Sequence, residues 1–368
     1  EQMHWGGGTP TFLSDEQMVD LMDHLRKRFN FSTAESADYS IEIDPRELRP
    51  NTLKLLRELG FNRTSFGVQD LNEKVQKAVN RIQPESMIRQ VMVEARELGF
   101  RSINIDLIYG LPHQSQQTFS ETLDVIMDMS PDRLSVFNYA HLPERFKPQR
   151  RIKEEDLPSP EEKLAILGNC ITTLTEVGYH YVGMDHFAKT DDELSRAQNN
   201  KILHRNFQGY TTHGDCDLIG FGVSSISQIS DCYLQNSPDI KVYEEAIEND
   251  QFPVVKLIET DKDDLIRRQV IMELLCHDQM IFAELDQAFS IDSQSYFAEE
   301  LSKLSPMVED ELLVMSDEGI HITEKGRLLV RNACMVFDTY LNANIIQSYS
   351  PSADASTPAN RPRFSKAI

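Results

Sequence analysis

Apolar and polar residues in the first half of the chain alternate between a helical and a strand-like period. Met18, Leu21, Met22 and Leu25 recur at helical spacing, and Ser14 opens a capping box just before them. Such patterns predict helices over 16–29, 51–59, 71–80, 84–98, 117–129 and 160–177, and strands near 3–5, 40–43, 64–68, 102–107, 134–139 and 180–184. This alternation is typical of a β/α barrel or an open doubly wound sheet. Ligands of such folds bind at the carboxyl ends of the strands.

A short motif repeats where a predicted helix gives way to a predicted strand. Its three copies are Leu59-Gly60-Phe61, Leu98-Gly99-Phe100 and Val177-Gly178-Tyr179. Each glycine suits the left-handed position just after a helix, and the aromatic residue then packs back onto that helix. A repeated helix–strand unit requires crossover connections, so the motif indicates a parallel sheet.

The pattern changes after about residue 260. It predicts helices over 261–275, 295–304 and 324–341, with a hairpin formed by 312–315 and 320–323 before the last helix. This order resembles a winged-helix module, but the segment is not basic, so an interaction or lid domain is favoured over DNA binding. We therefore expect a barrel over 1–190, a substrate-side extension over 191–259, a mainly helical domain over 260–345 and a low-complexity, disordered tail over 346–368.

Composition narrows the class of partner. The 368 residues carry a formal net charge of −22, which argues against nucleic acid or an anionic membrane as the main partner. No apolar run is long enough to span a membrane, and no signal-peptide pattern is present, so we expect a cytoplasmic protein and a monomer. The five cysteines lie far apart without a C-x2-C or C-x3-C pair, which favours reduced thiols and no metal site in this chain.

Three consecutive glycines, Gly6 to Gly8, follow the first predicted strand and precede Thr9 and Pro10. Glycines contribute no packing, but they allow positive φ and let the backbone approach a ligand closely. The bland alternative is a flexible turn. Their place at the end of a strand favours a ligand-binding loop.

Polar side chains also recur at the predicted carboxyl ends of the strands. They are Glu42 and Asp44, Gln69 and Asp70, Asp106, and Asn138. A solvated strand end explains any one of them. Several on one edge of a sheet instead predict a polar site, because an unpartnered carboxylate in an apolar strand is unfavourable.

These motifs together resemble the radical S-adenosylmethionine superfamily, and within it the oxygen-independent coproporphyrinogen III oxidase family. The resemblance covers residues 1 to about 345 and rests on His4–Pro10, Ile41–Arg46, Gly67–Asp70, Asn104–Pro112, Val136–His141 and His204–Thr212. It implies an incomplete (β/α)6 barrel, lacking its first strand here, with a helical, winged-helix-like C-terminal domain.

The resemblance also implies cofactor-binding residues. The backbone of Gly7, Gly8 and Thr9 would hold the methionyl amino group of S-adenosylmethionine, and Glu42 would anchor that first molecule. The other implied cofactor contacts are Gln69, Arg81, Asp106, Ala140 and Ile226. A second adenosylmethionine is expected in this family, and the implied catalytic residues Phe207 and Gln208 would lie beside it or the substrate.

The implied reaction is the oxidative decarboxylation of two propionates of coproporphyrinogen III to vinyl groups by a 5′-deoxyadenosyl radical, giving protoporphyrinogen IX in anaerobic haem biosynthesis. It requires a reductant and a reduced [4Fe–4S] cluster. The substrate carries four carboxylates, for which Arg150, Arg151 and Arg205 are candidate partners. Solvent-facing arginines on a connection are an equally good explanation of the first two.

One feature departs from the family pattern. The cluster is held there by C-x3-C-x2-C upstream of the glycines, and no cysteines here have that spacing. We therefore expect a fragment that is inactive by itself, with its cluster ligands upstream. Two alternatives stay open. A haem-binding or haem-delivery relative would lack decarboxylase activity, and an ordinary β/α-barrel enzyme would use the glycines for phosphate.

Overall fold

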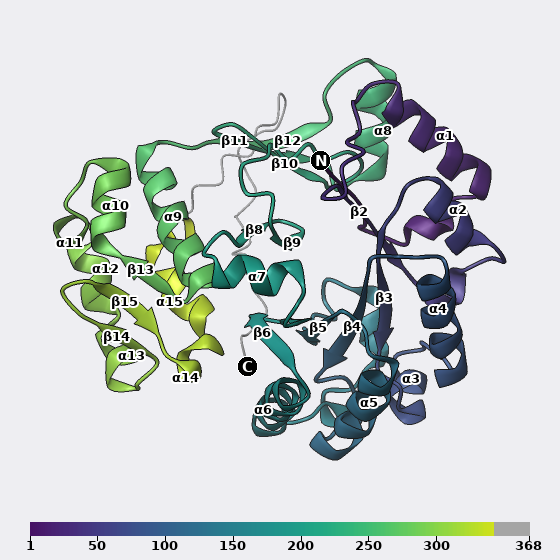
Figure 1. Ribbon diagram of the computed structural model, residues 1–368, viewed down its shortest axis with the longest axis horizontal. Coiled ribbons are helices and arrows are strands. Elements are labelled where there is room, and N and C mark those ends of the chain that lie inside the picture. The colour runs from purple at the N-terminus through teal and green to yellow at the C-terminus, as the bar shows by residue number, and fades with distance from the viewer. Residues whose placement is uncertain (342–368) are drawn as a thin grey trace. The chain divides into compact units, whose positions relative to one another are not determined.

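The computed structural model describes residues 1–341. The chain forms two compact units, one over Glu1–Ser195 and a second that begins at Arg196 (Figure 1). The predicted tail over 346–368 lies outside the described residues. None of the helices in the described part is long and apolar enough to cross a membrane.

The first unit is built on a seven-stranded sheet with the order β1-β2-β3-β4-β5-β7-β6. Its strands are β1 (Gln2–Trp5), β2 (Asp38–Ile43), β3 (Arg63–Gln69), β4 (Ser102–Tyr109), β5 (Arg133–Asn138), β6 (Tyr179–Gly183) and β7 (His186–Lys189). β1 to β5 pair in parallel, as the sequence predicts. The end of the sheet differs from a simple repeat, because β7 lies antiparallel between β5 and β6.

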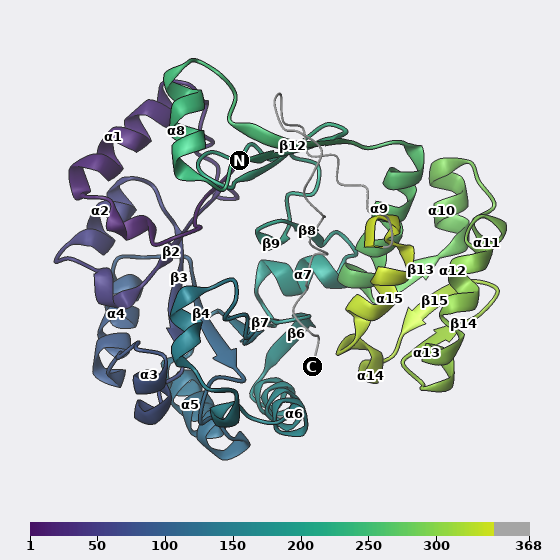
Figure 2. The same cartoon turned by 180° about the vertical axis from the view of Figure 1, so that it is seen from behind.

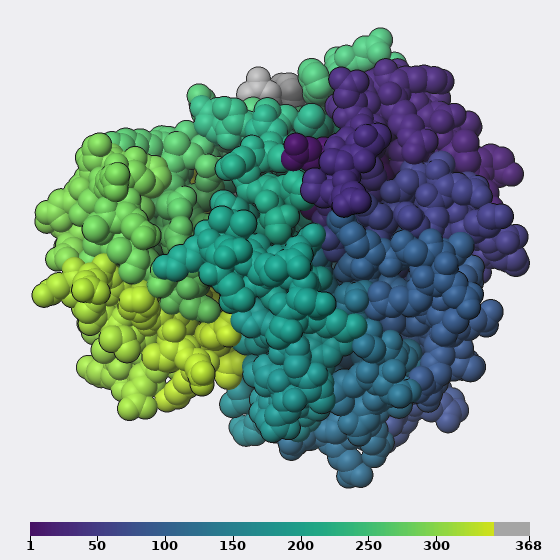
Figure 3. Space-filling model, in the orientation of Figure 1, coloured from purple at the N-terminus to yellow at the C-terminus, as the bar shows by residue number. Residues whose placement is uncertain are grey.

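Helices cover one side of this sheet. They are α1 (Asp15–Arg26), α2 (Thr52–Glu58), α3 (Glu73–Ala78), α4 (Glu85–Glu97), α5 (Gln116–Met129) and α6 (Pro160–Glu176). In Figures 1 and 2, α1 to α5 follow one another along the same side of the strands, and in Figure 3 their side chains form a continuous purple-to-blue surface. The predicted capping box at Ser14 is confirmed, with the Gln17 side chain accepting from the Ser14 amide. Short 3-10 turns occupy Pro10–Phe12, Pro45–Glu47, Lys147–Arg151 and Glu154–Asp156.

The repeated glycine motif ends three of the helices as predicted. Gly60, Gly99 and Gly178 have φ values of 97°, 76° and 95°. At the first copy, the amide of Phe61 donates to the Leu56 carbonyl at 3.0 Å, and the Phe61 ring is fully buried. These local signals fix where the chain turns from each helix into the next strand.

The two faces of the sheet differ in character. Side chains that face the helices are apolar and buried, as Ile41, Phe66 and Ile105 show with 0% exposure. The alternate positions on the inner face are polar and keep part of their surface accessible. They include His4, Ser40, Glu42, Ser65, Gln69, Asn104 and Asp106. The helix-covered face therefore holds the core, and the inner face is left for a ligand.

The second unit contains three small sheets. A hairpin joins β8 (His204–Asn206) to β9 (Gly209–Thr211), and a three-stranded sheet has the order β10-β11-β12, with β10 (Ile226–Ile229), β11 (Cys232–Asn236) and β12 (Val254–Glu259). The third sheet has the order β13-β15-β14, with β13 (Gln279–Ile281), β14 (Leu313–Met315) and β15 (Gly319–Ile322). β14 and β15 are the predicted hairpin, and β13 adds a strand that the sequence pattern did not predict.

Helices make up most of the rest of this unit. They are α8 (Ile240–Glu248), α9 (Lys262–His277), α10 (Phe282–Phe289), α11 (Ser293–Tyr296), α12 (Ala298–Lys303), α13 (Ser305–Glu309), α14 (Glu324–Arg327) and α15 (Val330–Phe337), while α7 (Glu193–Asn199) contains the boundary between the units. The prediction of a single helix over 324–341 is wrong. The helix breaks between α14 and α15, and a 3-10 turn over Thr339–Leu341 ends the described chain.

Candidate active site

Glu42 projects from β2 onto the inner face of the sheet beside β1. His4 bridges it to Ser40, with Nδ1 2.9 Å from the Ser40 hydroxyl and Nε2 3.2 Å from the Glu42 carboxylate. The register pairs His4 with Ser40, so Glu42 lies one inward position further along β2. The Glu42 side chain is 45% exposed and forms no ion pair with a lysine or arginine of residues 1–341. His4 therefore holds the Glu42 carboxylate in place, while the carboxylate oxygens can still accept hydrogen bonds from a ligand.

Asp106 lies two strands away on the same face. The Ser65 hydroxyl donates to Oδ2 at 2.7 Å, and the Asn104 amide donates to Oδ1 at 2.7 Å. Burial raises the pKa of Asp106 above its ordinary value, these hydrogen bonds lower it, and the nearby charge of Glu42 raises it further. Glu42 pairs in register with Ser65, so the two carboxylates share one neighbour.

Arg81 reaches this face from the loop after α3. Its Nη1 lies 3.1 Å from Asp44 Oδ2, and its Nη2 donates to the Gly67 carbonyl at 2.8 Å. Burial alone would raise the pKa of Asp44, but hydrogen bonds from Arg46 and the charge of Arg81 outweigh it, so that pKa is lowered. Burial lowers the pKa of Arg81, and the charge of Asp44 offsets this only in part.

Gln69 ends β3 in a left-handed conformation with φ of 70°, which is uncommon for a residue with a Cβ. Gln83, which is fully buried, holds this turn by donating to the carbonyls of Gly67 at 3.2 Å and Val68 at 2.9 Å. A Cβ added to Gly67 would lie 3.0 Å from Gln69 Nε2 and 3.1 Å from Arg81 Nη2. The bare backbone of Gly67 therefore lets both side chains lie over it, directly opposite Asp106 in the register.

The three glycines follow β1 at the same end of the sheet. A Cβ on Gly6 would lie 2.5 Å from His4 Nε2 and 2.9 Å from Glu42 Oε1, so a side chain at this position would displace one or both of these groups. Gly7 has φ of 98°, and a Cβ on Gly7 or Gly8 would meet nothing within 4 Å. The loop thus presents open backbone next to Glu42, and the flexible-turn alternative does not explain why Gly6 lies so close to the His4 and Glu42 side chains.

Asp70 does not belong to this group, and the prediction that all the strand-end side chains share one site is wrong for it. Asp70 is 1% exposed and lies on the helix side of the sheet. Its Oδ1 accepts from the Asn72 amide at 2.6 Å and from the Thr122 hydroxyl at 3.1 Å, and Gln114 donates to its Oδ2. Asp70 is therefore a structural carboxylate that orders the loop after β3.

Ala140, Arg150 and Arg151 lie on the connection that follows β5. The Gln149 amide donates to the Ala140 carbonyl at 3.0 Å, which ties this connection together. Arg150 donates from Nε to the Pro143 carbonyl at 3.0 Å. Both arginines are exposed and form no ion pair within the described range 1–341. They remain candidates for an anionic ligand.

Four predicted site residues lie in the second unit. Phe207 and Gln208 form the turn between β8 and β9, where Asn206 Oδ1 accepts from the Gln208 amide at 2.9 Å. Phe207 is 56% exposed, and its ring packs edge-on against Tyr233 at 5.7 Å. Arg205 lies over the Tyr210 ring at 4.8 Å, and Ile226 begins β10.

Sequence reasoning missed Lys163, which lies in the first turns of α6. Its Cε would be 3.0 Å from a Cβ on Gly110 at the end of β4, and Asn138 Oδ1 would be 3.3 Å from the same point. Burial lowers its pKa, and within the described part of the chain it forms no ion pair. The helix dipole disfavours a lysine near a helix N-terminus, and this unfavourable placement is the feature of the sequence that could have drawn attention to Lys163.

The described residues do not provide a metal centre. Cys170, Cys276 and Cys334 are buried, and all five cysteines are free thiols. No three His, Cys, Asp or Glu side chains within residues 1–341 lie close enough together to hold a metal ion. This part of the chain therefore supplies no ligand set for an iron–sulfur cluster.

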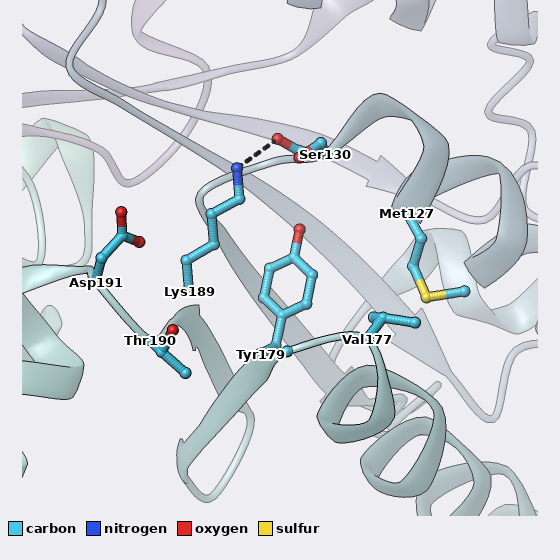
Figure 4. A pocket seen from close by; sticks show the side chains of 8 residues that line it. Met127, Ser130, Val177, Tyr179, Lys189, Thr190 and Asp191 are labelled. Carbon is cyan, nitrogen blue, oxygen red and sulfur yellow. Dashed lines mark hydrogen bonds between the residues drawn. The ribbon is translucent and has the colours of Figure 1, made fainter.

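A surface hollow of about 610 Å³ lies at the opposite end of the strands (Figure 4). Its wall includes Ser130 before β5, Tyr179 at the start of β6 and Lys189 at the end of β7. Lys189 donates to the Ser130 carbonyl at 3.2 Å, and the Tyr179 hydroxyl donates to the Pro131 carbonyl at 2.6 Å. Its main polar groups are thus already bonded within the protein, whereas Gln69 Oε1 and Arg81 Nε beside Gly67 are buried without a hydrogen-bond partner among residues 1–341.

Comparison with known proteins gives the same assignment for both halves of the chain. Residues 1–126 match the Radical SAM superfamily, and residues 260–329 match the HemN C-terminal domain. The oxygen-independent coproporphyrinogen III oxidase of Pseudomonas aeruginosa is 52% identical over 368 residues, which is all of this chain and 77% of that protein. The Escherichia coli protein of the same name is 51% identical over 340 residues, or 92% of this chain and 74% of that protein.

A solved structure agrees with the sequence comparisons. Coproporphyrinogen III oxidase (HemN) from Escherichia coli, described as a radical SAM enzyme, matches with a TM-score of 0.90 at 51% identity, covering 92% of this chain and 78% of that one. The predicted fold class is confirmed. The chain belongs to the oxygen-independent coproporphyrinogen III oxidases, which are oxidoreductases of the radical S-adenosylmethionine superfamily.

Proposed function

We propose that the inner face of the first unit binds S-adenosylmethionine for the oxidation of coproporphyrinogen III, in which two propionates become vinyl groups. The observation that supports this most is the grouping of Glu42, Gln69, Arg81 and Asp106 around the bare backbone of Gly67 and Gly6–Gly8. For each propionate, the reaction removes one hydrogen atom, CO2 and one electron. A reductant is the expected partner.

The residues present fit adenosylmethionine. Gln69 Oε1 and Arg81 Nε are buried and lack a hydrogen-bond partner among residues 1–341. Buried polar atoms without partners are costly, so a bound molecule with donors and acceptors would satisfy them. The open backbone at Gly7 and Gly8 adds amide donors beside the acceptor Glu42. A zwitterionic molecule with ribose hydroxyls matches this mixture of groups.

Bound adenosylmethionine supplies the hydrogen-abstracting radical in this superfamily. The chain's own residues bind and orient it. Gly7, Gly8 and Thr9 would hold its methionyl amino group, with Glu42 as the anchoring carboxylate. His4 and Ser40 keep Glu42 in place.

Gln69, Arg81 and Asp106 would make further polar contacts to the cofactor, and Ala140 and Ile226 would be wall positions. A second adenosylmethionine is part of the proposal. Phe207 and Gln208, at the exposed turn after β8, would contact that second molecule or the porphyrinogen. Arg150, Arg151 and Arg205 would bind substrate carboxylates. The described residues do not fit the [4Fe–4S] cluster that the family uses, so their roles concern adenosylmethionine and the substrate.

A haem-binding relative without decarboxylase activity is the second candidate. It would share the barrel and would retain haem after purification. The names and high identities of the relatives favour the oxidase.

The function is tested by following two products together. The chain is extended upstream by the family's first strand and its C-x3-C-x2-C segment, purified anaerobically and reconstituted with iron and sulfide. It is then given adenosylmethionine, a reductant and coproporphyrinogen III. We expect 5′-deoxyadenosine and CO2 to appear together. In Glu42→Ala both products should fall at least tenfold, because a charge-assisted hydrogen bond is worth about 1.5–3 kcal/mol.

Glu47→Ala is the matched control, since Glu47 is an exposed glutamate only five residues away. It should form both products at the wild-type rate. If the wild type forms 5′-deoxyadenosine without CO2, the assignment to the superfamily stands and coproporphyrinogen III is rejected as the substrate. Neither product, together with tightly retained haem, would favour the haem-binding alternative.

A further inference from the structure

Arg268 is a partly buried arginine of the second unit whose guanidinium makes one side-chain hydrogen bond within residues 1–341. It lies on α9, and its Nη1 donates to the Tyr233 hydroxyl at 3.2 Å. No acidic side chain of the described chain, 1–341, forms an ion pair with it. A guanidinium carries five N–H donors, so most of its hydrogen-bonding capacity is available to a ligand.

The neighbouring arginines show that this is not the rule in the second unit. Arg267, the preceding residue on the same helix, forms ion pairs with Asp263 at 2.7 Å and Glu300 at 2.9 Å. Arg327 pairs with Asp278 at 3.0 Å. In a chain with a net charge of −22, acidic partners are plentiful, so a partly buried arginine without one requires an explanation.

Arg268 is connected to the turn that carries Phe207 and Gln208. Tyr233, on β11, accepts its hydrogen bond, and the ring of the same tyrosine packs against Phe207 with centroids 5.7 Å apart. Met272, one helical turn beyond Arg268, accepts from the Arg205 amide at 3.3 Å, which holds β8 against this part of α9. An aromatic surface therefore lies next to an available cation.

Arg205 differs from Arg268 in its contacts. Its guanidinium lies 4.8 Å from the centre of the Tyr210 ring, and its Nη1 is buried and lacks a hydrogen-bond partner among residues 1–341. Tyr210 is itself buried and donates to the Leu275 carbonyl at 3.2 Å. This cation–π contact holds the Arg205 guanidinium against Tyr210, and Arg205 remains a candidate partner for another carboxylate of the substrate.

We propose that Arg268 binds a carboxylate of the substrate, with the Phe207–Tyr233 pair contacting the apolar part of the same molecule. The inference rests on the proposed function, because it takes a tetracarboxylate with a large apolar ring as the ligand. A planar guanidinium matches a carboxylate in a bidentate manner, and aromatic side chains provide an apolar contact surface. Tyr233 orients Arg268, and Arg267 anchors the helix that carries it.

Binding of coproporphyrin III, the fluorescent oxidised form with the same four carboxylates, tests this directly. The reconstituted wild type and Arg268→Gln are titrated anaerobically, and adenosylmethionine binding is measured on the same samples. We expect Arg268→Gln to weaken coproporphyrin binding at least tenfold while adenosylmethionine binding stays unchanged. Arg268→Lys, which keeps the charge but loses the planar fork, should bind with intermediate affinity.

Arg331→Gln removes an exposed arginine of the same unit and is the control. It should bind coproporphyrin like the wild type. Equal affinity of the wild type and both Arg268 variants would overturn the role of Arg268. Failure of the wild type itself to bind coproporphyrin would instead count against the proposed function, so the two failures are distinguishable.

Discussion

The inner face of the first unit's sheet carries charged residues at both ends of the strands, and the two ends differ in how many of these charges form ion pairs. At the amino ends of the strands, Arg63 pairs with Asp38 at 2.8 Å and with Glu193. Arg133 pairs with Asp192 at 3.0 Å and with the same Glu193 at 3.0 Å. At the carboxyl ends, Asp44 pairs with Arg46 and Arg81, but Glu42 and Asp106 form no ion pair with any lysine or arginine of residues 1–341.

This difference separates a structural cluster from a binding site made of the same residue types. Burial would raise the pKa of Glu193, but the charges of Arg63 and Arg133 outweigh it and lower that pKa. At the other end, burial raises the pKa of Asp106, and hydrogen bonds from Ser65, Ser135 and Asn104 offset this only in part. The paired end therefore stabilises the fold at neutral pH. The Asp106 carboxylate costs stability, and Glu42 and Asp106, the two carboxylates without a lysine or arginine partner, retain capacity for a ligand.

Removing one partner of the paired cluster should have the largest effect on stability. Arg133→Met leaves Asp192 and Glu193 without one of their cations in a buried place. Breaking a buried pair in this way costs about 3–5 kcal/mol, so we expect a large fall in the midpoint of thermal unfolding, measured by circular dichroism. Arg145→Met, at an exposed arginine, should unfold like the wild type. An unchanged midpoint in Arg133→Met would remove the contrast between the two ends.

Changing the unpaired end should have the opposite and smaller effect. Asp106→Asn removes a carboxylate charge and should raise the free energy of unfolding at neutral pH by about 1 kcal/mol, which corresponds to a rise of about 2–4 °C in the melting temperature. The same substitution should weaken adenosylmethionine binding. The folded protein holds the Asp106 proton more tightly than the unfolded chain does, so the wild type loses stability as pH rises above the ordinary aspartate pKa of 3.8.

The advantage of Asp106→Asn should therefore be complete at neutral pH and vanish as pH falls below that value. Thermal melts at several pH values check the sign. A variant that is less stable than the wild type at neutral pH would show that Asp106 is a structural carboxylate like Asp70.

Local signals in the sequence predict most of the first unit. The helix ends at Gly60, Gly99 and Gly178 and the cap at Ser14 depend on a few adjacent residues, and all of them are confirmed. The antiparallel pairing of β7 with β5 and of β12 with β11 joins segments that are separated by a helix in the sequence. Short strands of mixed polarity do not reveal such pairing.

The site is predicted in part. Two-residue alternation places Glu42, Gln69 and Asp106 on the inner face, and the same alternation places Asp70 with the buried residues Phe66 and Val68. Applied strictly, it would have excluded Asp70 in advance. Lys163 and Arg268 were missed because they lie on helices, and their significance comes from partners that they lack in the folded chain.

The most direct test of this account is adenosylmethionine binding by the wild type, Glu42→Gln and Glu47→Gln, measured anaerobically by equilibrium dialysis on reconstituted protein. We expect the wild type and Glu47→Gln to bind equally, and Glu42→Gln to bind at least tenfold more weakly with an unchanged melting temperature. Equal binding by all three proteins would contradict the assignment of the unpaired carboxyl ends as the adenosylmethionine site.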